Sequence, residues 1–193
     1  MIIRKLFKFE NAHIVRGCST TRCSQNIHGH SYKVEVLLES KYLDNGDMVY
    51  DFGLIKLRIK EFIDSFDHSI TLYNRDNIEY INDMKKHSKR WIELPVSPSA
   101  EQFSRVIFIV IDKILESTIM VNGENGVRLN SIIVHETDTG YAQCFRDDAY
   151  SLLMGKINID DIKFSAQTKA EWSDINLWSR IKNRELIENP NKI

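Results

Sequence analysis

Three histidines occur in a pattern that suits a metal ion. His28 and His30 are separated by a single glycine, so both imidazoles project to the same side of an extended strand. His13 ends an earlier alternating segment, on the face that also carries Phe7 and Phe9. If the two segments pair, three neutral imidazoles can hold one zinc ion and leave its fourth tetrahedral position open, as in catalytic sites. The alternative is that these histidines are ordinary polar residues near a strand end.

A cysteine lies close to this histidine pair. Cys23 precedes His28 by five residues, and a nearby divalent cation would stabilise its thiolate as a base or a ligand. A competing interpretation is a closed structural zinc site built from Cys18, Cys23, His28 and His30. Its spacing is irregular for that class and leaves His13 without a role. The three cysteines are an odd number, which favours free thiols.

Two acidic positions are further candidates. Asp67 and His68 are adjacent where a helix is expected to end, so the carboxylate could orient the imidazole as a proton relay, although most such pairs are structural. Glu136 follows an apolar strand and shares the face of Ile132 and Val134. A carboxylate there is costly unless it is paired. It either lies in water at the strand end or binds a ring with adjacent N–H donors.

Composition narrows the function classes. The 193 residues are 42% hydrophobic and 27% charged, which predicts a globular chain with a proper core. The formal net charge of −1 argues against a nucleic-acid partner. The longest apolar run, Val106–Ile111, is too short to cross a membrane, and the first residues do not resemble a signal peptide. We therefore expect a cytoplasmic protein.

Periodicity predicts an α+β fold. Residues 2–13 and 28–40 alternate as strands, and residues 127–137 and 140–147 predict a second strand pair around a turn at Asp138–Gly140. Helical spacing begins near Asp51 and ends near Asp67, and a capping box at Ser99–Gln102 opens a second helix. The expected order is β-β-α-α-β-β, with two helices on one face of a four-stranded antiparallel sheet. Residues 74–97 read as an irregular connection.

The pattern weakens after the fourth strand. We expect residues 1–147 to form one domain and residues 148–193 to be a C-terminal extension of unknown role. Within it, Trp172, Leu177, Trp178 and Ile181 indicate one amphipathic helix.

Taken in order, the motifs resemble the 6-pyruvoyl-tetrahydropterin synthase family, including its bacterial 6-carboxytetrahydropterin synthases. The resemblance runs from residue 1 to about 147. It rests on Phe9-Glu10-Asn11-Ala12-His13, Cys23 with His28-Gly29-His30, Val49-Tyr50-Asp51-Phe52, Asp67-His68, Pro98-Ser99-Ala100-Glu101 and His135-Glu136-Thr137.

The resemblance implies a tunnelling fold whose subunits assemble into a barrel, typically a hexamer, with active sites between subunits. It implies Zn2+ on His13, His28 and His30. By position, Cys23 resembles the proton acceptor, and Asp67 and His68 its relay partners. Glu136 resembles the pterin anchor, and Glu101 and Ser99 are further substrate-binding candidates.

The implied enzyme is a carbon–carbon lyase acting on 7,8-dihydroneopterin triphosphate. In the carboxy branch, triphosphate and acetaldehyde leave and 6-carboxy-5,6,7,8-tetrahydropterin forms, on the route to queuosine. Four residues, Ser24–Ile27, separate Cys23 from His28, whereas the carboxy branch has three and the pyruvoyl branch five. We favour the carboxy branch because the other early motifs resemble it more.

Other functions stay open at this point. Within the class, the alternatives are elimination to the 6-pyruvoyl product and a side-chain-cleaving variant in folate synthesis. An alternative from another class is a zinc-stabilised binding module without catalysis, for example for nucleic acid. The near-neutral net charge argues against a nucleic-acid partner, and an open three-histidine site argues against a structural zinc.

Overall fold

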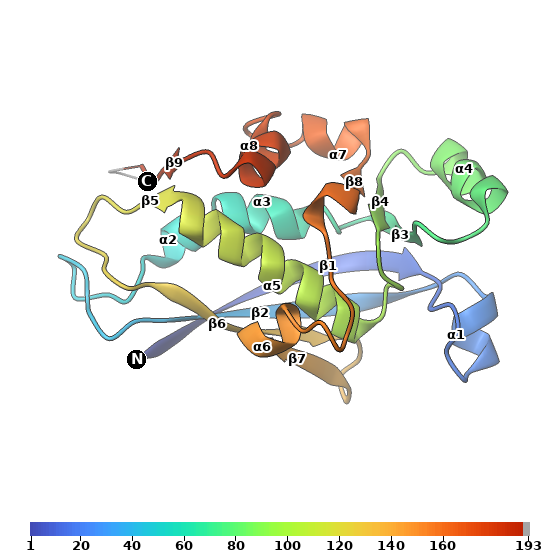
Figure 1. Cartoon of the computed structure of the whole chain (residues 1–193), viewed down its shortest axis with the longest axis horizontal. Helices are drawn as coiled ribbons and strands as arrows, with labels where there is room; N and C mark the ends of the chain where they lie inside the picture. The colour runs from blue at the N-terminus through green and yellow to red at the C-terminus, as the bar shows by residue number, and fades with distance from the viewer. Residues whose placement is uncertain (191–193) are drawn as a thin grey trace.

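A computed structural model describes residues 1–190 and is built around one twisted sheet (Figure 1). Within these residues the sheet has seven strands in the order β7-β6-β2-β1-β3-β4-β8. The four strands β7, β6, β2 and β1 are antiparallel neighbours, as the sequence predicts. Their bounds are β1 Ile2–His13, β2 His28–Glu39, β6 Arg128–His135 and β7 Tyr141–Phe145. The predicted α+β class is confirmed.

The β1–β2 hairpin is the longest pairing in the sheet. Its register is continuous from Ile2 opposite Glu39 to His13 opposite His28. The alternation that predicts the strands also sorts their side chains, because Phe7, Phe9, Tyr32, Val34 and Val36 are buried while their neighbours are more exposed. We call the face that carries these buried residues the inner face. The opposite face, with Lys8, Glu10 and Ser31, is the outer face.

Helices cover the inner face. The long helix α5 (Ala100–Ser117) packs against β6 and β7, and its residues Val106–Ile111 are buried almost all round. Ser99 caps its start by accepting a hydrogen bond from Gln102 N. The predicted first helix forms as two pieces, α2 (Phe52–Ile55) and α3 (Arg58–Asp64). The break occurs at Leu57, whose ψ of −111° is not helical.

Residues 74–97 are more regular than the sequence indicates. They contain α4 (Ile78–His87) and β4 (Trp91–Leu94), which pairs in parallel with β3 (Ser69–Tyr73). The helix is hard to recognise because Ile81 is its one fully buried residue in this exposed, charged segment. Asn77 nevertheless caps its start, accepting a hydrogen bond from Glu79 N.

The described part of the C-terminal extension shares the main core. It contains η1 (Ile159–Asp161), β8 (Lys163–Phe164), α7 (Ala166–Ala170), α8 (Leu177–Asn183) and β9 (Ile187–Glu188), and follows the short α6 (Arg146–Ala149). Strand β8 pairs with β4, and β9 pairs with β5 (Thr118–Ile119). The predicted amphipathic helix forms only from Leu177 onward. Trp172 lies outside it, with its ring 5.3 Å from that of Phe164.

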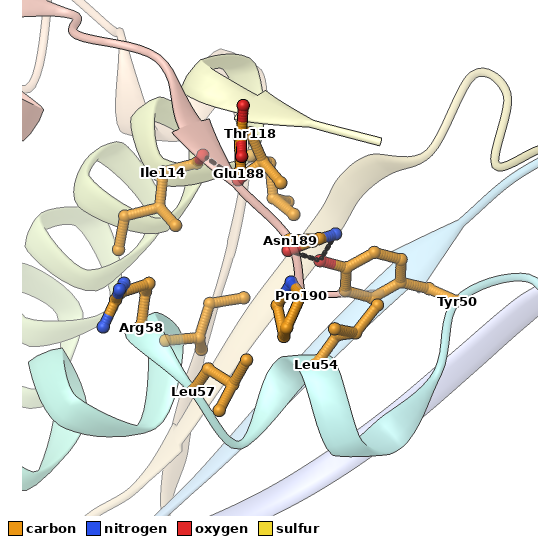
Figure 2. Close-up of a pocket in the computed structure, with 11 residues that line it drawn as sticks. Tyr50, Leu54, Leu57, Arg58, Ile114, Thr118, Glu188, Asn189 and Pro190 are labelled. Carbon is orange, nitrogen blue, oxygen red and sulfur yellow. Dashed lines mark hydrogen bonds between the residues drawn. The ribbon is translucent and has the colours of Figure 1, made fainter. Parts of the chain in front are cut away.

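The last described residues close over a cavity beside α2. Asn189 exchanges hydrogen bonds with the hydroxyl of Tyr50, at 3.0 and 3.3 Å (Figure 2). Leu54 and Leu57 from the α2–α3 region and Ile114 from α5 line the same cavity. The extension is therefore fastened to the domain at β8, at β9 and at this contact.

Two edges of the antiparallel sheet lack a partner strand within residues 1–190. Strand β7 is at one end of the sheet. Strand β1 pairs with β3 only at Asn11 and Ala12, so its first half has a neighbour on one side only. Helix α4 packs on the outer face beside Ala12 and Ile70. Elsewhere this face displays charged pairs such as Arg4 with Glu35. These surfaces can accept another chain.

Candidate active site

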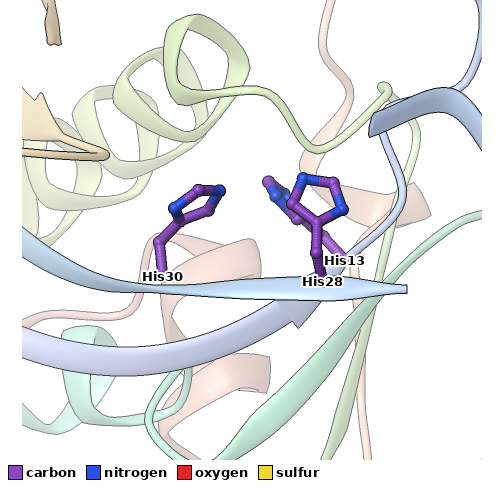
Figure 3. Close-up of side chains that lie close together, drawn as sticks. All are labelled: His13, His28 and His30. Atoms are coloured by element: carbon purple, nitrogen blue, oxygen red, sulfur yellow. The ribbon is translucent and has the colours of Figure 1, made fainter. Parts of the chain in front are cut away.

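The three predicted histidines form one cluster on the inner face. His13 is directly opposite His28 in the hairpin, and His30 follows two residues along the same side of β2. One ring nitrogen from each residue lies within 4.8 Å of the others (Figure 3). His13 is fully buried, whereas His28 and His30 are partly exposed. The cluster therefore has one wall in the protein and one side open to solvent.

Gly29 permits this arrangement. A Cβ atom at this position would lie 2.8 Å from the backbone oxygen of Asn11, closer than real Cβ contacts. The hairpin strands therefore approach too closely for any side chain at Gly29. Glycine is therefore needed at this position for the two strands to pack, and it also leaves no side chain between the two histidines.

Backbone carbonyls orient two of the imidazoles. Nδ1 of His13 donates to the oxygen of Pro98 at 2.5 Å, and Nδ1 of His28 donates to the oxygen of Asn26 at 3.0 Å. These bonds assign the proton to Nδ1 and leave Nε2 of each ring as a ligand atom. Burial, with smaller contributions from His28 and His30, lowers the pKa of His13 to about 4, although the hydrogen bond to Pro98 acts in the opposite direction. His13 is therefore neutral near pH 7, the state that binds a metal.

The donor set fits a zinc ion. Zinc–nitrogen bonds of about 2.0–2.1 Å place tetrahedral ligands roughly 3.4 Å apart, so the three rings need only small rotations to bind one ion. Among residues 1–190, neither Cys18 nor Cys23 belongs to the cluster. The closed cysteine–histidine site is therefore not formed by the described residues.

Glu136 lies beside the cluster, at the end of β6. Its Oε1 is 3.8 Å from Nε2 of His30 and 4.0 Å from Nε2 of His13. The hydroxyl of Tyr32 donates to the same oxygen at 3.3 Å. The Glu136 side chain is one-third exposed, so its carboxylate faces the open side of the site. The carboxylate and the metal ligands can therefore contact one bound molecule.

Tyr32 and Pro98 are site residues that the sequence reasoning missed. Tyr32 lies on the same face of β2 as His28 and His30. The two-residue period of the strand could therefore have placed its side chain beside the histidines from the sequence alone. It is fully buried, and burial followed by the charge of Glu136 raises the pKa of its hydroxyl far above the usual range. The contact of Pro98 with His13 is made by a backbone carbonyl, which no side-chain pattern reveals.

Comparison with known proteins identifies the family. Residues 2–147 match the 6-pyruvoyl tetrahydropterin synthase family. The chain belongs to this family. A Helicobacter pylori J99 protein named 6-carboxy-5,6,7,8-tetrahydropterin synthase is 36% identical over 186 residues, which cover 96% of this chain and 93% of that protein. An Aquifex aeolicus protein of the same name is 31% identical over 157 residues, covering 73% of this chain and 95% of that protein.

Solved structures agree on the fold. An uncharacterized protein of Wolinella succinogenes has a TM-score of 0.58 at 19% identity and covers 76% of this chain and 98% of its own. The Caenorhabditis elegans 6-pyruvoyl tetrahydropterin synthase has a TM-score of 0.52 at 17% identity, covering 75% of this chain and 94% of its own. The tunnelling fold expected for the 6-pyruvoyl tetrahydropterin synthase family is therefore confirmed. The family match and the names of the relatives indicate an enzyme of the 6-pyruvoyl tetrahydropterin synthase type.

Cys23 is the residue that resembles the proton acceptor of the family. It is on the short helix α1 (Thr21–Gln25), which precedes His28 in the sequence. Its backbone oxygen accepts a hydrogen bond from Val15 N at 3.0 Å, which ties the loop back to the end of β1. The sulfur of Cys18 instead donates to the oxygen of Thr20 at 3.3 Å. Both side chains are partly exposed. The base assignment stays a prediction.

Asp67 and His68 lie on the other side of the sheet. Nδ1 of His68 is 2.8 Å from Oδ2 of Asp67, whose Oδ1 accepts from Glu10 N at 2.8 Å. Partial burial opposes ionisation of Asp67, but these hydrogen bonds outweigh it and lower the pKa of the carboxyl. His68 is 76% exposed and borders an outer-face hollow with Ala12 and Ser31. The same hollow includes His30 among its lining residues, but within residues 1–190 neither Asp67 nor His68 makes a hydrogen bond or ion pair with the three clustered histidines.

The two remaining predicted residues occupy the start of α5. The hydroxyl of Ser99 accepts from Gln102 N at 3.4 Å and so has a capping role. Glu101, in the first turn, is exposed, and its charge contributes to the raised pKa of Tyr32. Glu101 therefore lies within electrostatic range of the Tyr32 hydroxyl. No helix within residues 1–190 is both long and apolar enough to cross a membrane.

Proposed function

We propose that this chain is a zinc-dependent 6-carboxy-5,6,7,8-tetrahydropterin synthase. It converts 7,8-dihydroneopterin triphosphate to 6-carboxy-5,6,7,8-tetrahydropterin, with release of triphosphate and acetaldehyde, in cytoplasmic queuosine biosynthesis. The observation that carries the proposal is the three-histidine cluster with Glu136 at its open side. The relatives from Helicobacter pylori, which align over almost the whole chain, support the choice of product.

His13, His28 and His30 are the residues that would hold zinc. When bound, the ion supplies Lewis-acid polarisation of oxygen atoms on the substrate side chain. The hydrogen bonds from His13 to Pro98 and from His28 to Asn26 place the proton on Nδ1 and orient both rings so that Nε2 is the ligand atom. These contacts also fix the wall against which the substrate side chain is placed.

Glu136 is the anchor for the pterin ring. The ring has neighbouring N–H donors in a guanidine-like edge, and a carboxylate can accept two of them at once. The hydroxyl of Tyr32 already donates to Oε1, which fixes the direction of the carboxylate before substrate arrives. We further propose Glu101, whose charge affects the Tyr32 hydroxyl, and Ser99, which follows the Pro98 that contacts His13, as substrate-binding residues.

Proton transfer requires a base near the substrate side chain. We assign this step to Cys23, whose thiolate removes a carbon-bound proton, with His68 and Asp67 as the relay. Because Asp67 and His68 are on the outer face, they serve the histidine cluster of a neighbouring copy. The open edges of β7 and β1 provide surfaces for such a homo-oligomer, which we expect to be a hexamer.

Product analysis decides the function. Zinc-loaded protein incubated with 7,8-dihydroneopterin triphosphate should yield 6-carboxytetrahydropterin, acetaldehyde and triphosphate, separated by liquid chromatography with mass detection. His28→Ala is the inactive control. A 6-pyruvoyl product without acetaldehyde would assign the chain to the pyruvoyl branch. Release of a side-chain aldehyde with a hydroxymethyl pterin would favour the folate-pathway variant, and no turnover would contradict catalysis.

A further inference from the structure

Another cavity lies between α5 and the segment that follows α6. It measures about 450 Å³, within the range of small-molecule sites. Its floor is apolar, with Ile109 from α5 and Ile157 and Ile159 from the segment that follows α6. Most of its other lining residues lie beyond residue 147, in the segment outside the family match. None of the three clustered histidines lines this cavity, which is therefore a different site.

The rim of this cavity is cationic. Lys113, Lys156, Lys182 and Arg184 line it, and Asp160 is the one acidic residue among the described lining residues. Within residues 1–190, the only ion pair that any of the four cations makes is the long one from Lys182 to Asp160, at 3.7 Å. The unbalanced charge distinguishes this place from the rest of a chain whose net charge is −1. An anion placed here would contact several cations at once.

Buried Arg105 holds the wall of the cavity in place. Its guanidinium donates to the backbone oxygens of Asp148, Ala149, Ser151, Met154 and Gly155, at 2.7–3.4 Å. One side chain thus binds five backbone carbonyls, two in α6 and three in the loop between α6 and η1. A loop fixed in this way loses little further conformational entropy when a ligand binds.

Tyr150 completes the wall, and it too is fixed. Its hydroxyl donates to Oδ2 of buried Asp112 at 2.7 Å, so the aromatic ring stays at the edge of the cavity. Arg146 lies 5.5 Å from the same ring and pairs with Asp112. The cavity therefore combines a fixed aromatic side, an aliphatic floor and a cationic rim.

We propose that this cavity binds a small phosphorylated molecule with an apolar or aromatic body, such as a nucleotide. A phosphate group carries more than one charge and accepts from several donors, which matches three lysines and an arginine better than a single carboxylate does. The isoleucine floor and the Tyr150 ring accept the uncharged body. The phosphate displaces Asp160 from Lys182 as it binds.

Calorimetric titration of the zinc-loaded full-length chain tests this site. The probes are the four common nucleoside 5′-monophosphates, the parent nucleosides and inorganic phosphate, at low ionic strength. We expect at least one nucleotide to bind one per chain with a Kd below about 1 mM, at least about tenfold tighter than its nucleoside or phosphate alone. Equal affinity for inorganic phosphate would overturn the role of the apolar floor, and no saturable nucleotide binding would overturn the site.

Charge variants locate the binding. The double variant Lys113→Gln/Lys156→Gln should weaken nucleotide binding at least about tenfold, because two of the cations are lost. Lys56→Gln/Lys89→Gln removes the same charge outside the cavity and should leave the Kd unchanged. His28→Ala should also bind the nucleotide normally. Loss of binding in His28→Ala, or equal weakening in both lysine pairs, would place the nucleotide elsewhere. Melting temperatures check that each variant is folded.

Discussion

The hydroxyl of Tyr32 lies 3.3 Å from Oε1 of Glu136, and both groups border the histidine cluster. The two residues are far apart in sequence and come from β2 and the end of β6, which pair directly. The contact joins a fully buried tyrosine to a carboxylate that is one-third exposed. The buried Tyr32 hydroxyl therefore holds the solvent-facing carboxylate of Glu136 in position.

Tyr32→Phe should weaken pterin binding without removing zinc. The change deletes the donor to Glu136 and leaves the aromatic packing, so we expect a loss of about 0.5–1.5 kcal/mol in binding free energy. Calorimetry with a pterin analogue and metal analysis measure the two effects. Tyr50→Phe is the matched control, because its hydroxyl bonds Asn189 beside another cavity. Equal effects of both variants would remove Tyr32 from the site.

Glu136→Gln should have a larger effect on the same measurement. It keeps the shape of the side chain but loses the charge and one acceptor, so pterin-analogue binding should weaken by roughly 1.5–3 kcal/mol. Glu35→Gln is the control, since Glu35 pairs with Arg4 and His135 away from the cluster. An unchanged dissociation constant in Glu136→Gln would contradict its role as anchor.

Zinc content tests the metal ligands. Purified protein should contain about one zinc per chain, and His28→Ala or His30→Ala should lose most of it while keeping the fold. Atomic emission and circular dichroism measure these properties. His87→Ala, at the exposed end of α4, should keep both zinc and activity. Full metal content in both ligand variants would show that the ion binds elsewhere.

Turnover of cysteine variants tests the base. Cys23→Ala should lose at least about a hundredfold in kcat, the scale of a general base, with near-normal zinc content. Cys18→Ala should stay close to the wild type. The reverse pattern would move the base to Cys18. Loss of zinc from both variants would favour the closed cysteine–histidine site and a protein without catalysis.

Thiol labelling should separate the third cysteine from the other two. Burial raises the pKa of the Cys144 thiol to about 12, so at pH 8 it is protonated and unreactive. Iodoacetamide should modify Cys18 and Cys23 in native protein and reach Cys144 only after denaturation. Because the thiolate fraction grows about tenfold per pH unit below the pKa, residual labelling of Cys144 should rise steeply with pH. Fast native labelling of Cys144 at pH 8 would contradict its burial.

The sequence predicts the hairpin and the histidine cluster because both depend on a two-residue period. Phe9, Tyr32 and Val34 alternate with polar neighbours, and the same period places His13, His28 and His30 together. Helix α5 is equally predictable, since Ser99 caps a long apolar stripe.

The parts that the sequence does not predict depend on distant partners. Strands β8 and β9 have two residues each, which is too few to show a hydrophobic period. They form because β4 and β5 provide backbone groups with which they pair. The proton position on His13 depends on the carbonyl of Pro98, a contact across 85 residues of chain. Likewise, the separation of Asp67 and His68 from the cluster follows from which face of the sheet they reach.

The long hairpin also determines when during folding the metal ligands come together. His13, His28 and His30 all belong to β1 and β2, joined by one loop, so closing a single short loop brings them into register. Helix α5 and the C-terminal strands are not needed for that step, although Pro98 later orients His13. An ion captured by the nascent hairpin would stabilise it while the rest of the chain is still leaving the ribosome. At the proposed zinc site, the ion would therefore hold β1 and β2 together in addition to any chemistry that it supplies.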